Sequence, residues 1–371
     1  NDDFEAAERV TLAGVEVVGG AISDSADVDI FDLGPVESGD RVVVSMSAAE
    51  ALNGALALFD ESGAALLVND HRNVYLGQRF PFIDVTSRRP SGRCFVAVAS
   101  TPGYPSRGSY SLGASIEHGA PIPPPRPDVV VLNFERANNV RIASRAPADI
   151  PAFNAANIDP VYAGLTDLMT AEIVRRVRED FAGYDIIVRS TFEGESTGRG
   201  ASQVHFGSLD YALLGVAEGV DEYNGQSGQH AVVFTDTFAV FMSLEPSAYE
   251  MAQAIANVAS HEIGHLLGLV HTSSAEDIMD VTASLRQLLA DQRFDRAPLY
   301  QIVFPIGDQD SAQLLLDAVG GDPELVEAAR QRKSRDSVRS RGPWEPAARQ
   351  LAAFGTCGGH KDARVGVRHG R

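Results

Sequence analysis

The chain has 371 residues, more than one hydrophobic core usually serves, so two domains are expected. Hydrophobic residues make up 44% and charged residues 22%, as in ordinary globular proteins, and no apolar run reaches the ~20 residues that a transmembrane helix needs. The formal charge of −19 argues against nucleic acid and anionic membranes as partners, because both would be repelled.

The chain starts at Asn1 rather than at a methionine, which indicates a processed start. We therefore expect that a secretory signal has been removed and that the protein is secreted or lies at the cell surface. Nothing in the composition indicates an oligomer, and we expect a monomer.

Residues 1–117 are predicted to form an all-β sandwich. Short, apolar and partly alternating runs such as 41–46, 55–59 and 94–98 are typical of strands. Turn sequences separate these runs, and Asp60 and Asp70 are expected to shape two of the turns. Regular short strands without a long helical period favour a sandwich.

The same region resembles the bacterial pre-peptidase C-terminal domain. The resemblance rests on strand cores and turns spread along the region: Asp27–Phe31, Ser38–Val42, Leu58-Phe59-Asp60 with Gly63, Asn69-Asp70, Gly92–Val98 and Gly108–Leu112. It implies a β-sandwich. Domains of that family usually follow a peptidase, whereas this region precedes the rest of the chain.

Residues 118–127 form a proline-rich linker, with prolines at 121, 123, 124, 125 and 127. Such a sequence favours extended polyproline geometry and predicts a semi-rigid spacer. The alternative is a docking ligand for a proline-binding domain.

Residues 128–330 are predicted to form an α/β domain with a mixed twisted sheet. Helical spacing covers 159–181, and a second helix opens at Ser247 with Glu250 three residues later, a capping-box signature. A Gly- and Asp-rich segment, 207–229, is predicted to be a loop. Four strands are predicted, at Asp128–Phe134, Tyr184–Arg189, Gln203–Phe206 and His230–Phe234.

Residues 331–371 form a basic tail with ten Lys or Arg residues against three Asp or Glu. The composition predicts disorder, and the alternative is an anion-binding arm. The two cysteines, Cys94 and Cys357, cannot form a disulfide framework. Because the two cysteines lie in different modules, free thiols are favoured. A single bridge between them is the alternative.

The residues that carry chemistry lie in the second predicted helix. His261 and His265 are four positions apart, so one helical face presents both imidazoles to a single point, as zinc binding requires. Glu262 lies next to the first histidine, about 100° around the helix, and can reach a water on the metal. Gly268 can take the positive φ that ends a helix, which would return His271 as a third ligand. Three ligands leave one position open, as in catalytic zinc sites.

Met279 follows the third histidine after a short connection, and the full set resembles the metzincin clan, most closely the matrixins. The resemblance implies a zinc peptidase in which His261, His265 and His271 bind the metal, Glu262 is the general base, Gly268 forms the turn and Met279 lies beneath the metal. Two features depart from the clan. Val281 stands where some members carry a tyrosine ligand, and Cys94 is expected to be a core residue rather than the zinc-blocking cysteine of a propeptide.

The residues predict hydrolysis of peptide bonds in a peptide or protein substrate, by a zinc-bound water that Glu262 deprotonates. The substrate is expected to lie along an edge strand, for which Val232–Thr235 is the candidate. A secreted endopeptidase is favoured. The alternatives are a narrow-specificity exopeptidase and a non-catalytic surface or adhesion protein stabilised by zinc.

Two weaker signals receive ordinary interpretations. Asp210, Glu218, Asp221 and Asn224 offer the hard oxygens that calcium prefers, but their spacing fits no known calcium loop, so a solvated acidic loop is expected. His205 is expected to be a structural histidine rather than a ligand of a second zinc.

Overall fold

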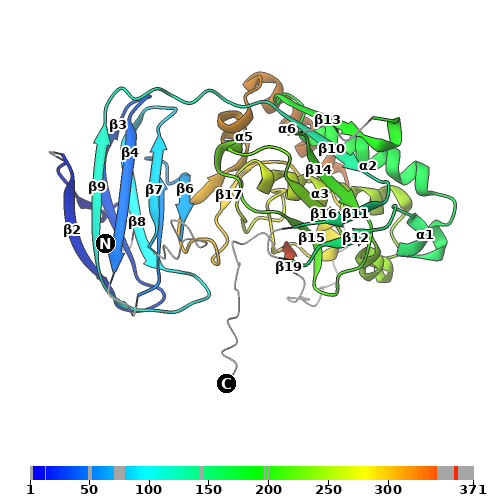
Figure 1. Cartoon of the computed structure of the whole chain (residues 1–371), viewed down its shortest axis with the longest axis horizontal. Coiled ribbons are helices and arrows are strands. Elements are labelled where there is room, and N and C mark those ends of the chain that lie inside the picture. Colours follow the sequence, from blue (N-terminus) through cyan, green and yellow to red (C-terminus); the bar gives the residue numbers. More distant parts are fainter. Residues whose placement is uncertain are drawn as a thin grey trace. The chain divides into compact units, whose positions relative to one another are not determined.

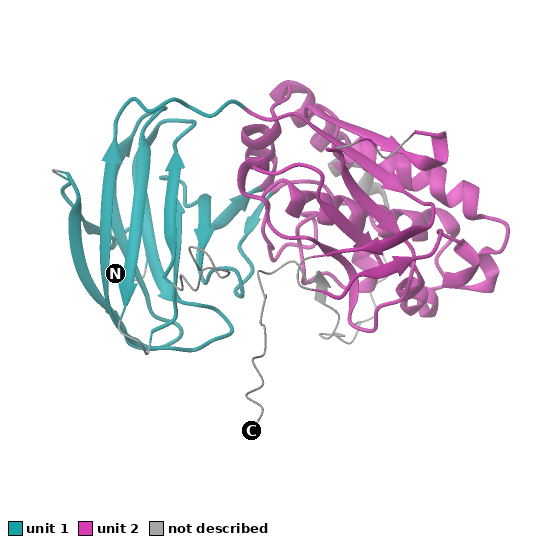
Figure 2. Cartoon of the chain, in the orientation of Figure 1, with its two compact units in different colours: residues 1–124, 296–310 teal, residues 125–295, 311–371 magenta. Residues whose placement is uncertain are grey.

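The computed structural model describes residues 3–12, 14–48, 52–70, 80–142, 145–195, 198, 200–340 and 355–357. These residues form two compact units (Figure 2). Unit 1 contains residues 1–124 and 296–310, and unit 2 contains residues 125–295 and 311–371. None of the described helices is long and apolar enough to cross a membrane.

Unit 1 is a sandwich of two sheets (Figure 1). One sheet has the order β1-β3-β8-β5-β6 and the other has the order β2-β9-β4-β7. The predicted β-sandwich is therefore confirmed, and Asp60 shapes a turn as expected, since its Oδ1 accepts hydrogen bonds from the Ser62 and Ala64 amides. The strands are β1 Glu8–Arg9, β2 Glu16–Ile22, β3 Val28–Val36, β4 Arg41–Ala48, β5 Gly54–Phe59, β6 Ala65–Asn69, β7 Phe82–Thr86, β8 Ser91–Ser100 and β9 Gly108–Glu117.

A later piece of chain completes unit 1. Strands β17 (Arg296–Pro298) and β18 (Asp308–Asp310) form an antiparallel pair in this piece. The Asp308 amide donates to the Gly63 carbonyl, and the Phe304 ring packs 5.9 Å from the Phe59 ring. Residues 296–310 were predicted to belong to the α/β domain, but the structure groups them with the sandwich, because their apolar and main-chain partners lie there.

Unit 2 is built on a mixed sheet with the strand order β13-β10-β14-β16-β15-β19. The first four strands run parallel, β15 runs antiparallel to β16, and β19 pairs parallel with β15. The predicted α/β class with a mixed sheet is confirmed. The strands are β10 Asp128–Asn133, β13 Ile186–Ser190, β14 Ser202–Phe206, β15 Leu213–Ala217, β16 His230–Val233 and β19 Gly355–Cys357, with a separate hairpin of β11 Ala137–Val140 and β12 Ala148–Ile150.

Helices of unit 2 pack around one large apolar core. The two long helices α2 and α3 bury Met169, Ile173, Ile255 and Ile263 in this core. The face of α2 that buries Met169 and Ile173 follows the helical spacing of the sequence. The helices are α1 Ala155–Ile158, α2 Thr166–Asp180, α3 Ala248–Leu266, α4 Leu285–Leu288, α5 Ser311–Val319 and α6 Pro323–Ser340, and the 3₁₀ helices are η2 Pro160–Tyr162, η3 Thr191–Glu193, η4 Glu222–Asn224 and η5 Thr235–Leu244.

Helix α6 extends into the region that was predicted to be a disordered tail. Its Lys333 donates to the buried carboxylate of Asp180 on α2 and, at 2.8 Å, to Asp291. The Ser260 hydroxyl of α3 also donates to Asp180. A basic residue of the tail is thus an ion-pair partner inside unit 2 rather than part of a solvated arm. Most of the later tail lies outside the described residues.

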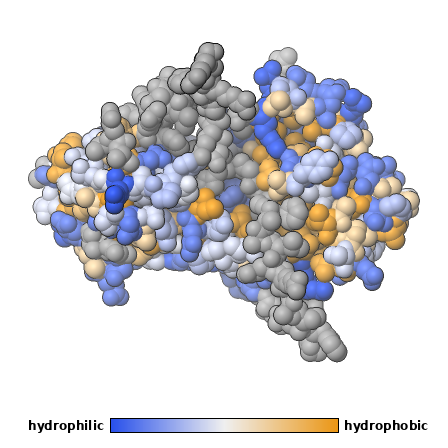
Figure 3. Space-filling view, turned by 90° about the horizontal axis from the view of Figure 1, so that it is seen from below, coloured by the Kyte–Doolittle hydropathy of each residue, from blue (hydrophilic) through white to orange (hydrophobic). Residues whose placement is uncertain are grey.

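The face drawn in Figure 3 mixes hydrophilic and hydrophobic residues. Large exposed apolar side chains are spread over many elements, among them Val17 on β2, Ile187 on β13 and Tyr249 on α3. Singly exposed apolar residues of this kind are normal on protein surfaces.

Candidate metal centre

Helix α3 carries the first part of the site and is fixed at its start by a complete capping box. The Ser247 hydroxyl accepts from the Glu250 amide, and the Glu250 carboxylate accepts from the Ser247 amide at 2.8 Å. Every residue from Met251 to Leu266 is buried, as the sequence predicted for a core helix. The side chains of this helix therefore have little freedom to move, which suits a site with fixed geometry.

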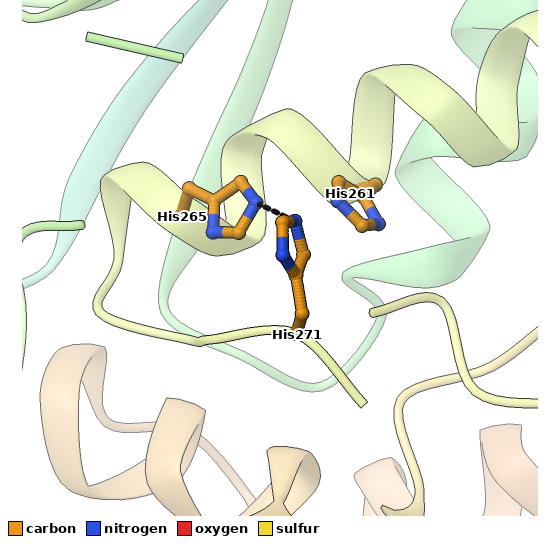
Figure 4. Close-up of side chains that lie close together, drawn as sticks. All are labelled: His261, His265 and His271. Atoms are coloured by element: carbon orange, nitrogen blue, oxygen red, sulfur yellow. Dashed lines mark hydrogen bonds between the residues drawn. The ribbon is translucent and has the colours of Figure 1, made fainter. Parts of the chain in front are cut away.

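The helix ends where Gly268 turns the chain back. Gly268 has a φ of +102°, and a Cβ at this position would lie 2.9 Å from the Asp221 carbonyl oxygen and 3.0 Å from the Tyr223 nitrogen. Glycine is needed here for the backbone angle and for the close approach of the neighbouring loop. The turn returns the chain so that His271 faces the helix (Figure 4).

The three histidines converge on one point. Their ligand atoms all lie within 4.8 Å of one another, and each side chain is buried. The Nε2 atoms of His265 and His271 are 3.1 Å apart, close to the roughly 3.3 Å expected when two imidazole nitrogens bind one tetrahedral zinc at ~2.05 Å. The structure thus brings together the three residues that the sequence placed at the metal.

Two carbonyl oxygens orient the imidazoles. His261 Nδ1 lies 2.7 Å from the Ile278 carbonyl, and His265 Nδ1 lies 2.8 Å from the Leu269 carbonyl. A carbonyl only accepts, so each Nδ1 carries the proton and each Nε2 presents its lone pair to the metal. His261 Nε2 is buried and has no hydrogen-bond partner among the described residues. A buried nitrogen of this kind suits a metal ligand, so the histidines fit zinc.

Burial also sets the charge state of the first ligand. It lowers the pKa of His261 to about 4, and the hydrogen bond to Ile278 only partly opposes this effect. The imidazole is therefore neutral at physiological pH, the form that binds zinc.

Glu262 follows His261 on α3 and is fully buried. Strand β15 passes directly against its carboxylate, since a Cβ on Gly215 would lie 2.4 Å from Glu262 Oε1. Close contact between a strand backbone and this carboxylate leaves room only for glycine.

Met279 is fully buried and packs against α3. A Cβ on Gly264, the residue before His265, would lie 2.5 Å from Met279 Sδ. The Met279 carbonyl accepts from the Thr272 amide at 2.9 Å, which ties the methionine segment to the residue after His271.

The structure corrects the prediction for the region around the edge strand. Residues 207–229 were predicted to be a loop but contain β15. The candidate edge Val232–Thr235 begins in β16, which lies between β14 and β15 and is not an edge strand. Leu213–Ala217 is a short apolar run, a signal that its Gly- and Asp-rich surroundings concealed. Beyond β15, the described sheet contains only the three-residue strand β19.

The weaker candidates have partners within the protein. His205 Nδ1 lies 3.1 Å from Asn133 Nδ2, its Nε2 lies 3.1 Å from His230 Nδ1, and burial lowers its pKa to about 4. Asp210 accepts from Arg145, and Asp221 accepts from the Gly225 and Gln226 amides. Within the described chain, the three histidines are the only metal-ligand group, so calcium receives no support.

Cys94 is a buried free thiol on β8, and burial raises its pKa to about 12. It is a core residue, as expected. The side chain of Cys357 lies outside the described residues.

A family model described as matrixin matches residues 166–294. This segment is therefore similar to the matrixin family. It contains α2, the β15 edge, the three histidines, Glu262 and Met279, and the matrixin family implies a catalytic zinc. No curated protein matches the chain.

Solved structures also match parts of the chain. Archaemetzincin from Methanopyrus kandleri is 13% identical, with a TM-score of 0.27, over 57% of this chain and 96% of that chain. The pre-peptidase C-terminal domain of a Bacillus anthracis collagenase is 15% identical, with a TM-score of 0.25, over 31% of this chain and all of that chain. A periplasmic inhibitor of g-type lysozyme from Aeromonas hydrophila is 17% identical, with a TM-score of 0.22, over 30% of this chain and all of that chain.

Proposed function

We propose that the chain is a secreted zinc endopeptidase in which Glu262 activates the attacking water. The observation that carries this proposal is the convergence of three buried histidines on one point, with the buried residue Glu262 directly after His261 on α3. A structural zinc site would be closed by a fourth protein ligand, whereas the described residues offer three.

Zinc bound by His261, His265 and His271 would lower the pKa of a bound water toward ~7 and polarise the scissile carbonyl. Glu262 accepts the proton of the attacking water and carries it to the nitrogen of the leaving amine. The Ile278 and Leu269 carbonyls keep two imidazoles in the tautomer that binds metal.

The substrate is proposed to lie extended along β15. The Leu214 carbonyl accepts from the Phe234 amide, so Leu214 faces β16 and its neighbours Leu213 and Gly215 turn their main-chain groups to the other side. In the structure β19 pairs with Leu213 and Gly215, so a substrate strand that replaces β19 can pair with these groups. Gly215 brings this side of β15 against Glu262. The backbone of the substrate would then pass the catalytic carboxylate.

Replacing Glu262 tests the mechanism. Glu262→Ala should lower kcat/KM by roughly 10²- to 10⁴-fold, the contribution that a general base of this kind makes. Zinc content, measured by atomic absorption, should stay at one ion per chain because the three ligands are unchanged. Activity of the unaltered chain should disappear with a chelator and return with added zinc. Full activity in Glu262→Ala would contradict the proposed role of Glu262 as the general base.

The cleavage pattern separates the alternatives. Mapping products from a peptide library with blocked and free ends should show internal cleavage of blocked peptides if the chain is an endopeptidase. Cleavage only next to free ends would favour an exopeptidase. Absence of cleavage with zinc bound would favour a non-catalytic protein. Secretion is tested by fractionating cells that express the gene with its natural leader.

A further inference from the structure

A second buried carboxylate, Asp277, lies in the segment between His271 and Met279 and takes no part in the proposed mechanism. Its side chain is fully buried, and burial raises its pKa to about 7. A buried carboxyl group carries a large desolvation cost, so its place in a fold requires several compensating hydrogen bonds.

Four hydrogen-bond donors converge on this carboxyl group. The Thr272 hydroxyl lies 2.7 Å from Oδ2, and the Ser311 hydroxyl lies 3.3 Å from the same atom. The Asp295 amide donates to Oδ1 at 3.1 Å, and the Met279 amide also donates to the carboxyl group. The donors come from four separate positions along the chain, so one side chain fixes all four relative to one another.

Two of these donors adjoin the metal site. Thr272 follows His271 directly, and its amide also donates to the Met279 carbonyl at 2.9 Å. Between Asp277 and Met279 lies Ile278, whose carbonyl accepts from His261 Nδ1. Asp277 therefore influences the position of His271 through Thr272, the next residue in the chain. It influences the position of His261 through the turn that orients the Ile278 carbonyl.

The other two donors hold the turn against the body of unit 2. Asp295 and Ser311 are the residues at which the chain leaves and re-enters this unit. The Ser311 amide donates to the Asp295 carbonyl at 3.1 Å, and the Ile278 amide donates to the Arg293 carbonyl at 3.0 Å. The turn that carries Ile278 and Met279 is thus anchored at both of its sides.

We propose that Asp277 is a positioning residue for zinc, which fixes His261 and His271 in the geometry that binds the metal. This inference rests on the proposed function for the identity of the metal. It concerns the affinity for zinc and the orientation of the ligands, and both can be measured without a substrate.

The test compares Asp277→Ala with Asp277→Asn in the full chain. Alanine leaves the Asp295 and Met279 amides without their acceptor, so the affinity for zinc should fall about 10- to 100-fold, the usual effect of losing a group that orients metal ligands. Asparagine keeps one oxygen for the two amides and gives its NH₂ group to the two hydroxyls, which can also accept. It should restore the affinity to within a few-fold. Competition with a chelator of known affinity measures both.

A spectroscopic readout follows His261 in the zinc-free chain. Nitrogen-15 chemical shifts should show Nδ1 protonated in the unaltered chain and in Asp277→Asn, and a mixture of tautomers in Asp277→Ala. If Asp277→Ala does not fold, Thr272→Val removes a single donor from the same carboxyl group, and a several-fold loss of zinc affinity is expected instead.

Asp32→Ala in unit 1 is the matched control. Asp32 is also buried and accepts from Arg9, Arg93 and the Gly34 amide, so its loss should lower the unfolding temperature without changing the affinity for zinc. An unchanged zinc affinity in Asp277→Ala, or an equal loss in Asp32→Ala, would overturn the inference. If Asp277→Ala loses zinc affinity as expected while the zinc-loaded unaltered chain cleaves no peptide, the role of Asp277 is supported and the proposed peptidase function is rejected.

Discussion

Gly215 shows how a single absent side chain shapes the candidate site. Its Cα lies so close to the carboxylate of Glu262 that a Cβ would meet Oε1 at 2.4 Å and Val258 Cγ1 at 2.8 Å. Both neighbours lie on the buried helix α3. The packing therefore links the residue type on β15 to the position of the proposed general base.

Gly215→Ala should separate catalysis from metal binding. The added methyl group displaces the Glu262 carboxylate, and a misplacement on the order of 1 Å can cost about 100-fold in rate. We expect kcat to fall about 100-fold while zinc content stays at one ion per chain. Steady-state kinetics and metal analysis measure the two effects.

Gly19→Ala on β2 of unit 1 is the matched control for this change. It is also a strand glycine, and its nearest contact to an added Cβ is the Tyr110 carbonyl oxygen at an ordinary 3.9 Å. It should leave kcat unchanged. Normal catalysis by Gly215→Ala would contradict the packing argument.

The sequence predicted the candidate metal ligands better than it predicted the residues that contact and position them. The spacing of His261, His265 and His271 with Gly268 is a local pattern that helix geometry alone interprets. The roles of Gly215, Ile278 and Asp277 depend on which segments meet after folding. No spacing rule connects Gly215 to Glu262, so sequence reasoning missed this contact.

At the scale of elements, β15 is the strand along which the substrate is proposed to lie. It was missed because a five-residue apolar run inside a Gly- and Asp-rich segment is a weak signal for a strand. In the fold it gains its stability from pairing with β16 and from packing on α3. The tertiary contacts, rather than local propensity, make it a strand.

The short strand β19 occupies the side of β15 on which the substrate is proposed to bind. Leu213 pairs with Gly355 and Gly215 pairs with Cys357. Thr356 lies between these partners, so its N–H and C=O face β15 in a parallel ladder. A substrate strand and β19 would therefore compete for the same main-chain groups.

Thr356→Pro should relieve this competition, because proline has no N–H to donate. We expect KM for a peptide substrate to fall several-fold with little change in kcat. Hydrogen exchange at the Leu213 and Gly215 amides should become faster when no substrate is present, which provides a readout independent of activity.

Ala363→Pro places the same substitution in the tail outside β19 and should leave both KM and exchange unchanged. Equal KM values and equal exchange rates for Thr356→Pro and the unaltered chain would show that β19 does not compete.

At the scale of the whole chain, the composition predicted two modules, and the order of strand-rich and mixed regions predicted their classes. The return of residues 296–310 to unit 1 could not be predicted, because it depends on long-range partners. Gly307 shows the fit: its φ is +84°, and an added Cβ would lie 2.2 Å from Phe59 Cε1. Its carbonyl accepts from the Leu299 amide at 2.9 Å.

Gly307→Ala should destabilise unit 1, although residue 307 lies far along the chain from the sandwich strands. Overpacking and backbone strain together should lower the free energy of unfolding by roughly 1–3 kcal/mol. Differential scanning calorimetry should show a lower transition temperature. Gly103→Ala is the control, because Gly103 has a similar φ of +78° and no atom within 4 Å of an added Cβ. Equal shifts for the two variants would argue against the packing role.

The division of unit 1 into two pieces of chain also constrains when this unit can finish folding during translation. The segment that completes the sandwich follows the histidines, Glu262 and Met279 in the sequence. During translation unit 1 therefore cannot be completed until residues 125–295 have left the ribosome, and unit 2 is completed only by residues 311–371, which follow. A nascent chain stopped before residue 296 would carry every proposed catalytic residue together with an incomplete sandwich.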